Sequence, residues 1–188
     1  MGSKVGQLRI LGIDPGSRIV GFAVIDTNAQ MRISTSTCKI VDVGVIKTDV
    51  SMPYSERISL IHEAVYEIIC CHSPHICIIE KAFVGINSLS ALKLGEARGA
   101  LLCAIHRAGV KAREVAPTEV KKLVTGDGRA SKEQVNMALA TLLNFKRGTL
   151  PYDASDALAI ALYYGMVHPL ESLKAYPGRA EPVQEKRL

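Results

Sequence analysis

Short apolar runs separated by turn residues predict five β-strands. The runs at Leu8–Ile13 and Val20–Asp26 flank an Asp-Pro-Gly turn, which predicts a hairpin, and Ile40–Lys47 predicts a third strand. Two later runs, Ile76–Glu80 and Lys111–Val115, are equally short. The run at Ile76–Glu80 is apolar at every position before its last residue, a pattern typical of a central strand that is covered on both faces.

Helices account for most of the remaining chain. In Met52–Cys71 the residues Ile58, Ile61, Val65 and Ile68 fall on one stripe with helical spacing. Further helices are predicted at Asn87–Ala108, Pro117–Val124, Ser131–Leu143 and Pro151–Val167, with Ser131 as a cap. Parallel strands need crossover helices, and this order of elements supplies them. The expected fold is therefore α/β, a central five-stranded mixed sheet with helices on both faces.

One folded domain, residues 1–168, is expected, followed by a flexible tail at 169–188. The tail contains Pro177, Gly178 and Pro182 and lacks any apolar period. Of the 188 residues, 48% are hydrophobic and 22% are charged, which excludes a disordered chain and is enough for one core. The polar start Met1–Gln7 lacks the apolar core of a signal peptide, and no apolar run reaches bilayer length. A soluble, cytoplasmic protein is expected.

The charge balance is compatible with a polyanionic partner but is weak support for one. Lys and Arg number 23 against 18 Asp and Glu, a net charge of +5. The 5 cysteines show no spacing typical of zinc ligands, so reduced thiols are the expected state. Gly95 and Gly99 lie four apart in a predicted helix and would let another backbone approach closely. That backbone could belong to the sheet or to a second copy of the chain.

Four acidic residues interrupt apolar sequence. Asp14 ends the first strand, Glu80 ends the fourth, and Asp153 and Asp156 open the last helix. Each has a purely structural explanation when it is taken alone. Asp14 could serve a turn, Glu80 could mark the point where a strand surfaces, Asp153 could cap the helix, and Asp156 could complement the helix dipole.

Taken together, the four acids suggest a metal site. Asp153 and Asp156 are three apart and share a helix face. If the first and fourth strands are neighbours, Asp14 and Glu80 lie side by side, and a helix crossing that edge would unite all four. Clustered carboxylates repel one another, and their hard oxygen atoms favour Mg²⁺ or Mn²⁺. Two such ions about 3.5–4 Å apart can activate a water and stabilise the leaving oxygen of a phosphodiester.

Four blocks of the sequence resemble RuvC-type Holliday junction resolvases, in the order in which that family has them. They are GIDPGSRIVGFAVID at 12–26, IEKAFVGINSLSALKLGEARGALL at 79–102, APTEVKKLVTGDGRASKEQV at 116–135 and DASDALAIALYY at 153–164. The resemblance runs from about Leu8 to Tyr164. The first block alone is unspecific, because actin-like ATPases share it, whereas the second and third blocks are much more specific.

The resemblance implies an RNase H-like fold and a homodimer. It implies symmetric, Mg²⁺-dependent nicks in four-way (Holliday) DNA junctions during recombination and repair, with two ions per site and Mn²⁺ as a possible substitute. The metal ligands would be Asp14, Glu80, Asp153 and Asp156, and all four are present. The implied partner is a branch-migration complex, a junction-binding tetramer with a hexameric ATP-driven motor. This chain has no P-loop of its own.

The resemblance also assigns Lys121 and Lys132 to the neighbourhood of the scissile phosphate, where a lysine can offset developing charge. A solvated helix face is the alternative for either lysine.

Further DNA contacts are implied around the same edge of the fold. Phe83, in the loop after Glu80, is placed to stack on an unpaired base at the crossover. Folding back onto the core is the alternative for this residue. Lys81, Lys122 and Arg129 are candidates for contacts with backbone phosphates, which position a duplex without reading its sequence.

Three rival functions follow from the same residues. The first is an RNase H-like nuclease acting on RNA or flaps, which would cut those substrates as well as junctions. The second is a junction-binding module without cleavage, against which the presence of all four acids argues. The third is an actin-like ATPase domain, which needs a second lobe that this chain is too short to supply.

Overall fold

The computed structural model describes residues 7–28, 38–81, 88–146 and 148–167. These residues build one five-stranded sheet in the order β3-β2-β1-β4-β5. The strands are β1 (Gln7–Asp14), β2 (Ile19–Asn28), β3 (Cys38–Lys47), β4 (Ile76–Glu80) and β5 (Lys111–Val115). The first three form an antiparallel meander, and β4 and β5 run parallel to β1. The predicted mixed sheet is confirmed, and β1 and β4 are neighbours.

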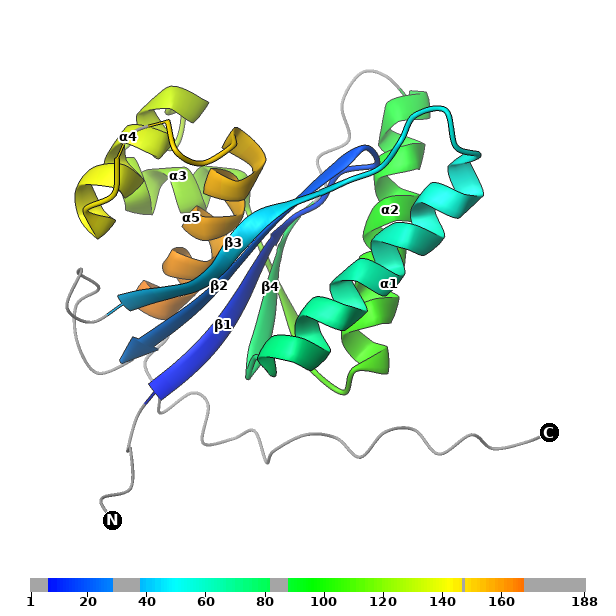
Figure 1. Ribbon diagram of the computed structural model, residues 1–188. Helices are drawn as coiled ribbons and strands as arrows, with labels where there is room; N and C mark the ends of the chain where they lie inside the picture. Colours follow the sequence, from blue (N-terminus) through cyan, green and yellow to red (C-terminus); the bar gives the residue numbers. More distant parts are fainter. Residues whose placement is uncertain (1–6, 29–37, 82–87, 147, 168–188) are drawn as a thin grey trace, which may run out of the picture.

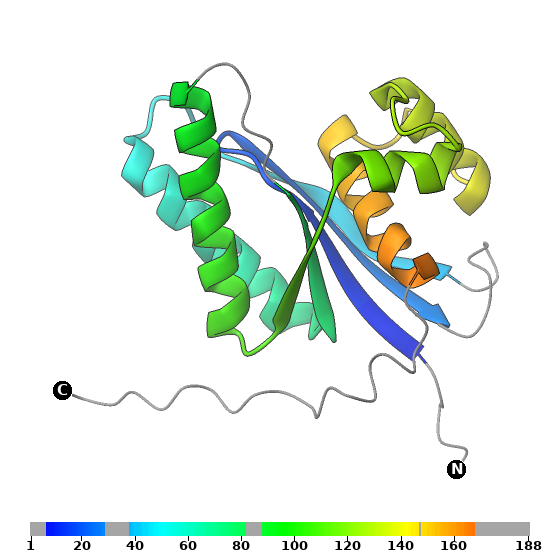
Figure 2. The same ribbon diagram turned by 180° about the vertical axis from the view of Figure 1, so that it is seen from behind.

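Helices cover both faces of this sheet (Figures 1 and 2). One face carries α1 (Tyr54–His72) and α2 (Ser88–Arg107), and the other carries α3 (Pro117–Thr125), α4 (Lys132–Leu143) and α5 (Tyr152–Val167). The predicted RNase H-like arrangement is confirmed. Within the described ranges, no helix combines the length and the apolar character that crossing a bilayer requires.

The central strands are apolar on both sides because each side faces a separate core. Along β1, Leu8 and Ile10 belong to the core under α3, α4 and α5, whereas Leu11 and Ile13 belong to the core under α1 and α2. Successive side chains of a strand point to opposite faces, so a strand buried on both faces shows as a continuous apolar run. This explains the lack of polar residues from Ile10 to Ile13 in β1 and from Ile76 to Ile79 in β4.

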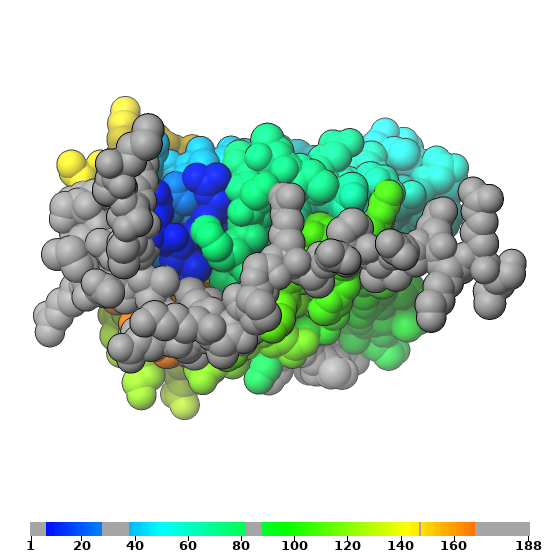
Figure 3. Space-filling model, turned by 90° about the horizontal axis from the view of Figure 1, so that it is seen from below, coloured from blue at the N-terminus to red at the C-terminus, as the bar shows by residue number. Residues whose placement is uncertain are grey.

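An ion pair links β1 to β2 at the end of the sheet where β1 begins. The Arg9 guanidinium binds both carboxylate oxygens of Asp26 at 2.7 and 2.8 Å and also donates to the His72 carbonyl at 2.9 Å. Figure 3 looks onto this end, where the blue start of β1 lies next to the last turn of α1. The contact with Arg9 holds the pKa of the Asp26 carboxyl below its usual range. The acids proposed for chemistry lie at the opposite end of β1.

Candidate active site

The strand register places Asp14 and Glu80 side by side. The parallel pairing of β1 and β4 runs through Ile13 opposite Ile79, so Asp14 and Glu80 are the next residues on each strand. Asp14 shares a face with Ile10, and Glu80 shares a face with Ile78, because side chains alternate along a strand. Ile10 and Ile78 both belong to the core under α5. Both acids therefore project on the side of the sheet that α5 covers.

Two glycines allow α5 to lie directly on the strands. A Cβ atom added to Gly12 would overlap the Ala157 carbonyl, and one added to Gly21 would overlap the Asp153 carbonyl. Gly21 is also the cross-strand partner of Asp14. The missing side chains therefore bring the first turn of α5, with its aspartates, close to the end of β1. A glycine inside an apolar strand indicates that another backbone packs closely against the strand at that position.

Lys132 lies between the acids of α5. Its Nζ is 2.8 Å from Asp156 Oδ2 and 3.7 Å from Asp153 Oδ1. Lys132 opens α4, directly after the Ser131 cap, whose Oγ accepts from the Gln134 N–H at 3.3 Å. The Gln134 side chain in turn accepts from the Ser131 N–H at 2.7 Å, so this helix start is fixed at both groups. The predicted cap is confirmed, and it fixes the position of Lys132 at the start of α4.

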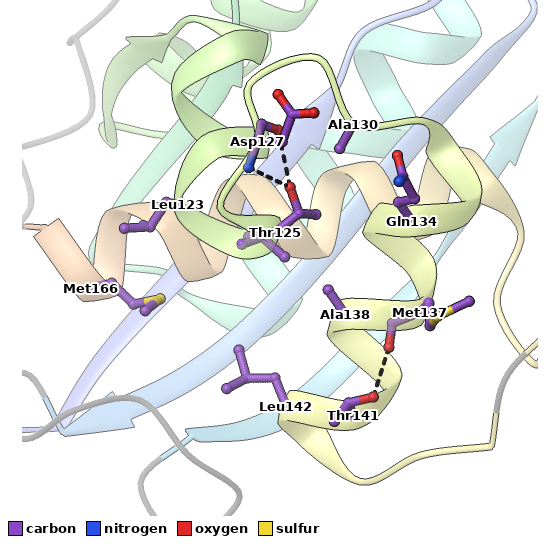
Figure 4. Close-up of a pocket in the computed structure, with 11 residues that line it drawn as sticks. Leu123, Thr125, Asp127, Ala130, Gln134, Met137, Ala138, Thr141, Leu142 and Met166 are labelled. Atoms are coloured by element: carbon purple, nitrogen blue, oxygen red, sulfur yellow. Dashed lines mark hydrogen bonds between the residues drawn. The ribbon is translucent and has the colours of Figure 1, made fainter.

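These groups line a small pocket of about 160 Å³. Its polar lining consists of Asp14, Glu80, Asp156, Lys121 and Lys132, and its apolar walls come from Pro117, Val120, Val135 and Ala159. A larger, mainly apolar pocket of about 560 Å³ lies between α3, α4 and the end of α5 (Figure 4). That pocket contains only one carboxylate, Asp127, so the smaller one is the candidate for chemistry.

The two lysines compensate the carboxyl groups of the small pocket only in part. Burial raises the pKa of Asp14 to about 8, and the negative charges of Glu80, Asp156 and Asp153 add to this effect while Lys132 opposes it. Burial and Asp156 likewise raise the pKa of Glu80 to about 7, against the lowering effect of Lys132 and Lys121. An added cation would relieve this repulsion and favour the charged carboxylates.

The donor set suits a hard divalent cation, since it consists of carboxylate oxygens. As the side chains stand, however, no three His, Cys, Asp or Glu side chains in the described part of the chain converge closely enough to hold a metal ion. The Lys132 ammonium takes the place of a counter-ion at Asp156. Asp153 does not line the pocket, and binding of a metal by all four acids would therefore require side-chain movement.

Of the remaining sequence candidates, Lys121 is half-buried and lines the pocket. Lys81, Lys122 and Arg129 are exposed and are not part of its lining. Phe83 falls outside the described residues.

The sequence comparisons decide the family. A family model described as crossover junction endodeoxyribonuclease RuvC matches residues 10–164. The chain belongs to the RuvC family. It is 40% identical over 182 residues to the RuvC of Paraburkholderia phytofirmans, covering 96% of this chain and 95% of that protein. It is also 40% identical over 161 residues to the RuvC of Protochlamydia amoebophila, covering 86% and 92%. The resemblance drawn from the four sequence blocks is confirmed.

Solved structures agree with this assignment. The RuvC of T. thermophilus, solved in complex with a Holliday junction substrate, matches with a TM-score of 0.75 and 31% identity, covering 85% of this chain and 93% of that one. The yeast mitochondrial Holliday junction resolvase Ydc2 matches with a TM-score of 0.62 at 16% identity, covering 91% and 82%. That second likeness shows a shared fold.

Proposed function

We propose that this chain is a crossover junction endodeoxyribonuclease that resolves four-way (Holliday) DNA junctions by paired, symmetric, Mg²⁺-dependent nicks. One observation carries the proposal. In a chain that matches the RuvC family from residue 10 to residue 164, Asp14, Glu80 and Asp156 line one pocket with two lysines. Recombination and DNA repair are the setting in which such junctions arise.

The acids are assigned as the metal ligands. Asp14, Glu80, Asp153 and Asp156 hold two Mg²⁺ ions, for which Mn²⁺ can substitute, and the unrelieved repulsion at Asp14 and Glu80 supports this assignment. When bound, the two ions supply an activated water and stabilise the leaving 3′ oxygen. The apolar wall of Val120, Val135 and Ala159 excludes bulk water and strengthens every charge interaction in the pocket.

The lysines act on the phosphate. Lys132 partly neutralises Asp156 and Asp153 in the free protein. With cations held by these acids, its ammonium would be available to contact a non-bridging phosphate oxygen. Lys121, which also lines the pocket, contributes a second positive charge as the phosphoryl group becomes more negative.

Contacts with the junction arms are assigned to exposed groups near this pocket. Lys81, Lys122 and Arg129 bind backbone phosphates and so fix the position of the junction. Phe83 stacks on a base at the crossover.

The protein acts as a homodimer, because a two-fold dimer presents two equivalent pockets to a junction with near two-fold symmetry. The outer face of α2 supports this assignment. Leu89 and Leu92 are each 60% exposed there, and Gly95 and Gly99 are exposed on the same helix. Among the described residues, no atom lies within 4 Å of a Cβ added at either glycine. Of the two explanations for these glycines, packing on the sheet is therefore wrong. A cytoplasmic location and a branch-migration complex as partner complete the proposal.

Cleavage of a labelled four-way junction tests this function. The junction is compared with a linear duplex of the same sequence, in Mg²⁺ and in EDTA, and with an RNA–DNA hybrid and a flap as further substrates. Paired Mg²⁺-dependent cuts at the junction, with little cutting of the other substrates, are expected. Equal cutting of the hybrid or the flap would contradict junction selectivity, and tight junction binding without cuts would indicate a binding module.

A further inference from the structure

Two buried side chains, those of Arg57 and Thr48, hydrogen-bond to the backbone of the turn that follows Asp14. The Arg57 guanidinium, on the first turn of α1, donates through Nη2 to the Ser17 carbonyl and through Nε to Thr48 Oγ1 at 3.1 Å. Thr48 donates to the Arg18 carbonyl from its N–H at 2.9 Å and from its hydroxyl at 3.2 Å. Two consecutive carbonyls of the β1–β2 turn are thus fixed by this pair.

The environment of Arg57 is unusual for a structural arginine. Only 8% of Arg57 and 9% of Thr48 is exposed. Buried guanidinium groups are normally paired with a carboxylate, because an unpaired buried charge is costly. Among the residues that the structure describes, no carboxylate lies within ion-pair distance of Arg57. Its donors instead serve a hydroxyl and a turn carbonyl.

The orientation of Arg57 is itself fixed by the packing of α1 on α2. The guanidinium carbon lies 5.7 Å from the centre of the Tyr54 ring, a distance at which a cation and an aromatic ring attract each other. The Tyr54 hydroxyl donates to the Lys93 carbonyl of α2 at 2.7 Å. The two helices therefore hold the guanidinium in place against the turn.

Among the acids of the site, Asp14 is the one whose position depends most directly on this turn. It is the last residue of β1 and is paired with β2 through Gly21, whereas the register with β4 ends one residue earlier, at Ile13. On the β4 side, the position of its carboxylate therefore depends on the turn that follows it. A displacement of about 1 Å in a reacting group can cost about a hundredfold in rate.

We propose that Arg57 and Thr48 are positioning residues for Asp14. By holding the Ser17 and Arg18 carbonyls, they keep the Asp14 carboxylate beside Glu80, on the side of the sheet that α5 covers. Neither residue touches the substrate or the reacting atoms. This inference rests on the proposed metal site at Asp14 and adds to it the elements that hold its most buried ligand.

The test compares two substitutions of one residue. Thr48→Val keeps the shape of the side chain and removes the hydroxyl, whereas Thr48→Ser keeps the hydroxyl. The readouts are the single-turnover rate of junction cleavage, the junction affinity in EDTA, the melting temperature, and Mn²⁺ binding to the DNA-free protein by calorimetry. Thr48→Val is expected to lower the rate about tenfold and to weaken Mn²⁺ binding about fivefold, the effect of losing about one hydrogen bond. Junction affinity should stay within about twofold.

Thr48→Ser should restore both the rate and Mn²⁺ binding to near the native values, and Arg57→Met provides a second variant with the larger loss. Arg9→Met is the matched control, because it breaks the ion pair with Asp26 at the far end of β1. It is expected to lower the melting temperature, because it leaves the buried Asp26 carboxylate without its partner, while cleavage stays within about twofold of the native rate.

The proposal is overturned if Thr48→Val cuts and binds Mn²⁺ like the native protein, or if Thr48→Ser is as impaired as Thr48→Val. It is also overturned if Arg9→Met loses as much cleavage at the same loss of melting temperature. Asp14→Asn, measured in parallel, separates this result from a failure of the metal site. If Asp14→Asn still cuts, the site itself is misassigned, whereas an inactive Asp14→Asn beside a fully active Thr48→Val rejects the positioning role alone.

Discussion

The Lys132 ammonium lies 2.8 Å from Asp156 Oδ2, at the junction of α4 and α5. The same Nζ is 3.7 Å from Asp153 Oδ1, so one side chain from α4 partly neutralises both acids of α5. Asp14 and Glu80, on the strands below, retain raised pKa values despite this lysine. The Lys132 ammonium therefore stabilises the pocket, but its positive charge does not fully offset the negative charge of the carboxylates.

Lys132→Met is expected to separate metal binding from catalysis. Removal of the lysine frees Asp156 and Asp153, so Mn²⁺ should bind the DNA-free protein several-fold more tightly. Cleavage should nevertheless fall about a hundredfold, because the charge that stabilises the transferring phosphoryl group is gone. Calorimetry and single-turnover cleavage measure the two effects. Lys146→Met, at an exposed position in the loop after α4, is the control. Weaker metal binding together with an unchanged rate would contradict this role.

Asp14→Asn is expected to stabilise the metal-free protein, and more so at high pH. The folded-state pKa of Asp14, about 8, lies above its ordinary value of 3.8, so the folded protein binds this proton more tightly than the unfolded chain does. Stability in EDTA therefore falls as the pH rises from about 4 to about 8, and the asparagine removes this loss.

Thermal unfolding in EDTA measures this effect. The gain in melting temperature from Asp14→Asn should be about 10 °C larger at pH 8.5 than at pH 5, from about 1.4 kcal/mol per pH unit and about 2–4 °C per kcal/mol. Glu67→Gln, at an exposed position of α1, is the control for charge removal. An equal gain at both pH values, or a loss at pH 8.5, would show that Asp14 is not held in an uncompensated acidic cluster.

Gly21→Ala should disable the site without removing any catalytic group. The added methyl would overlap the Asp153 carbonyl and push the first turn of α5 away from Asp14. A cleavage loss of about a hundredfold is expected from such a displacement. Gly44→Ala is the control strand glycine, because its methyl would meet only the Phe22 ring, at 3.1 Å. Comparable cleavage by the two variants at matched stability would rule out the close approach of α5 as a requirement.

Leu92→Glu should weaken the proposed dimer. A charge on the exposed apolar face of α2 would have to be buried on association, which opposes it. Light scattering is expected to show a shift from dimer to monomer, and junction cleavage should change from paired cuts to single nicks. Val50→Glu, at an exposed position before α1, is the control. A dimer that persists unchanged in Leu92→Glu would place the interface elsewhere.

Much of this fold can be predicted from sequence because its signals are local. The strands at Ile76–Glu80 and Lys111–Val115 have the predicted bounds, and Ser131 caps the predicted helix, since apolar runs and capping residues act over a few positions. The meeting of Asp14 and Glu80 could be predicted only on the condition that their strands are neighbours, which the sheet order satisfies.

Long-range contacts could not be read in the same way. Thr48 lies 31 residues from Ser17, and Arg57 lies 40 residues from it, and no periodicity links such positions. Lys132 and its aspartates are likewise brought together by the packing of α4 on α5. The spacing of Gly95 and Gly99 predicted a close approach of another backbone. It could not show that both glycines lie on the exposed face of α2 rather than against the sheet.

The most direct test of the central claim is anomalous scattering from Mn²⁺ in crystals of the native protein, with Asp14→Asn crystals as the control. The account predicts anomalous peaks within ligand distance, about 2.2 Å, of carboxylate oxygens of Asp14, Glu80 and the α5 aspartates, with a peak lost in Asp14→Asn. Peaks confined to other parts of the surface, or peaks at the pocket that are identical in Asp14→Asn, would contradict it.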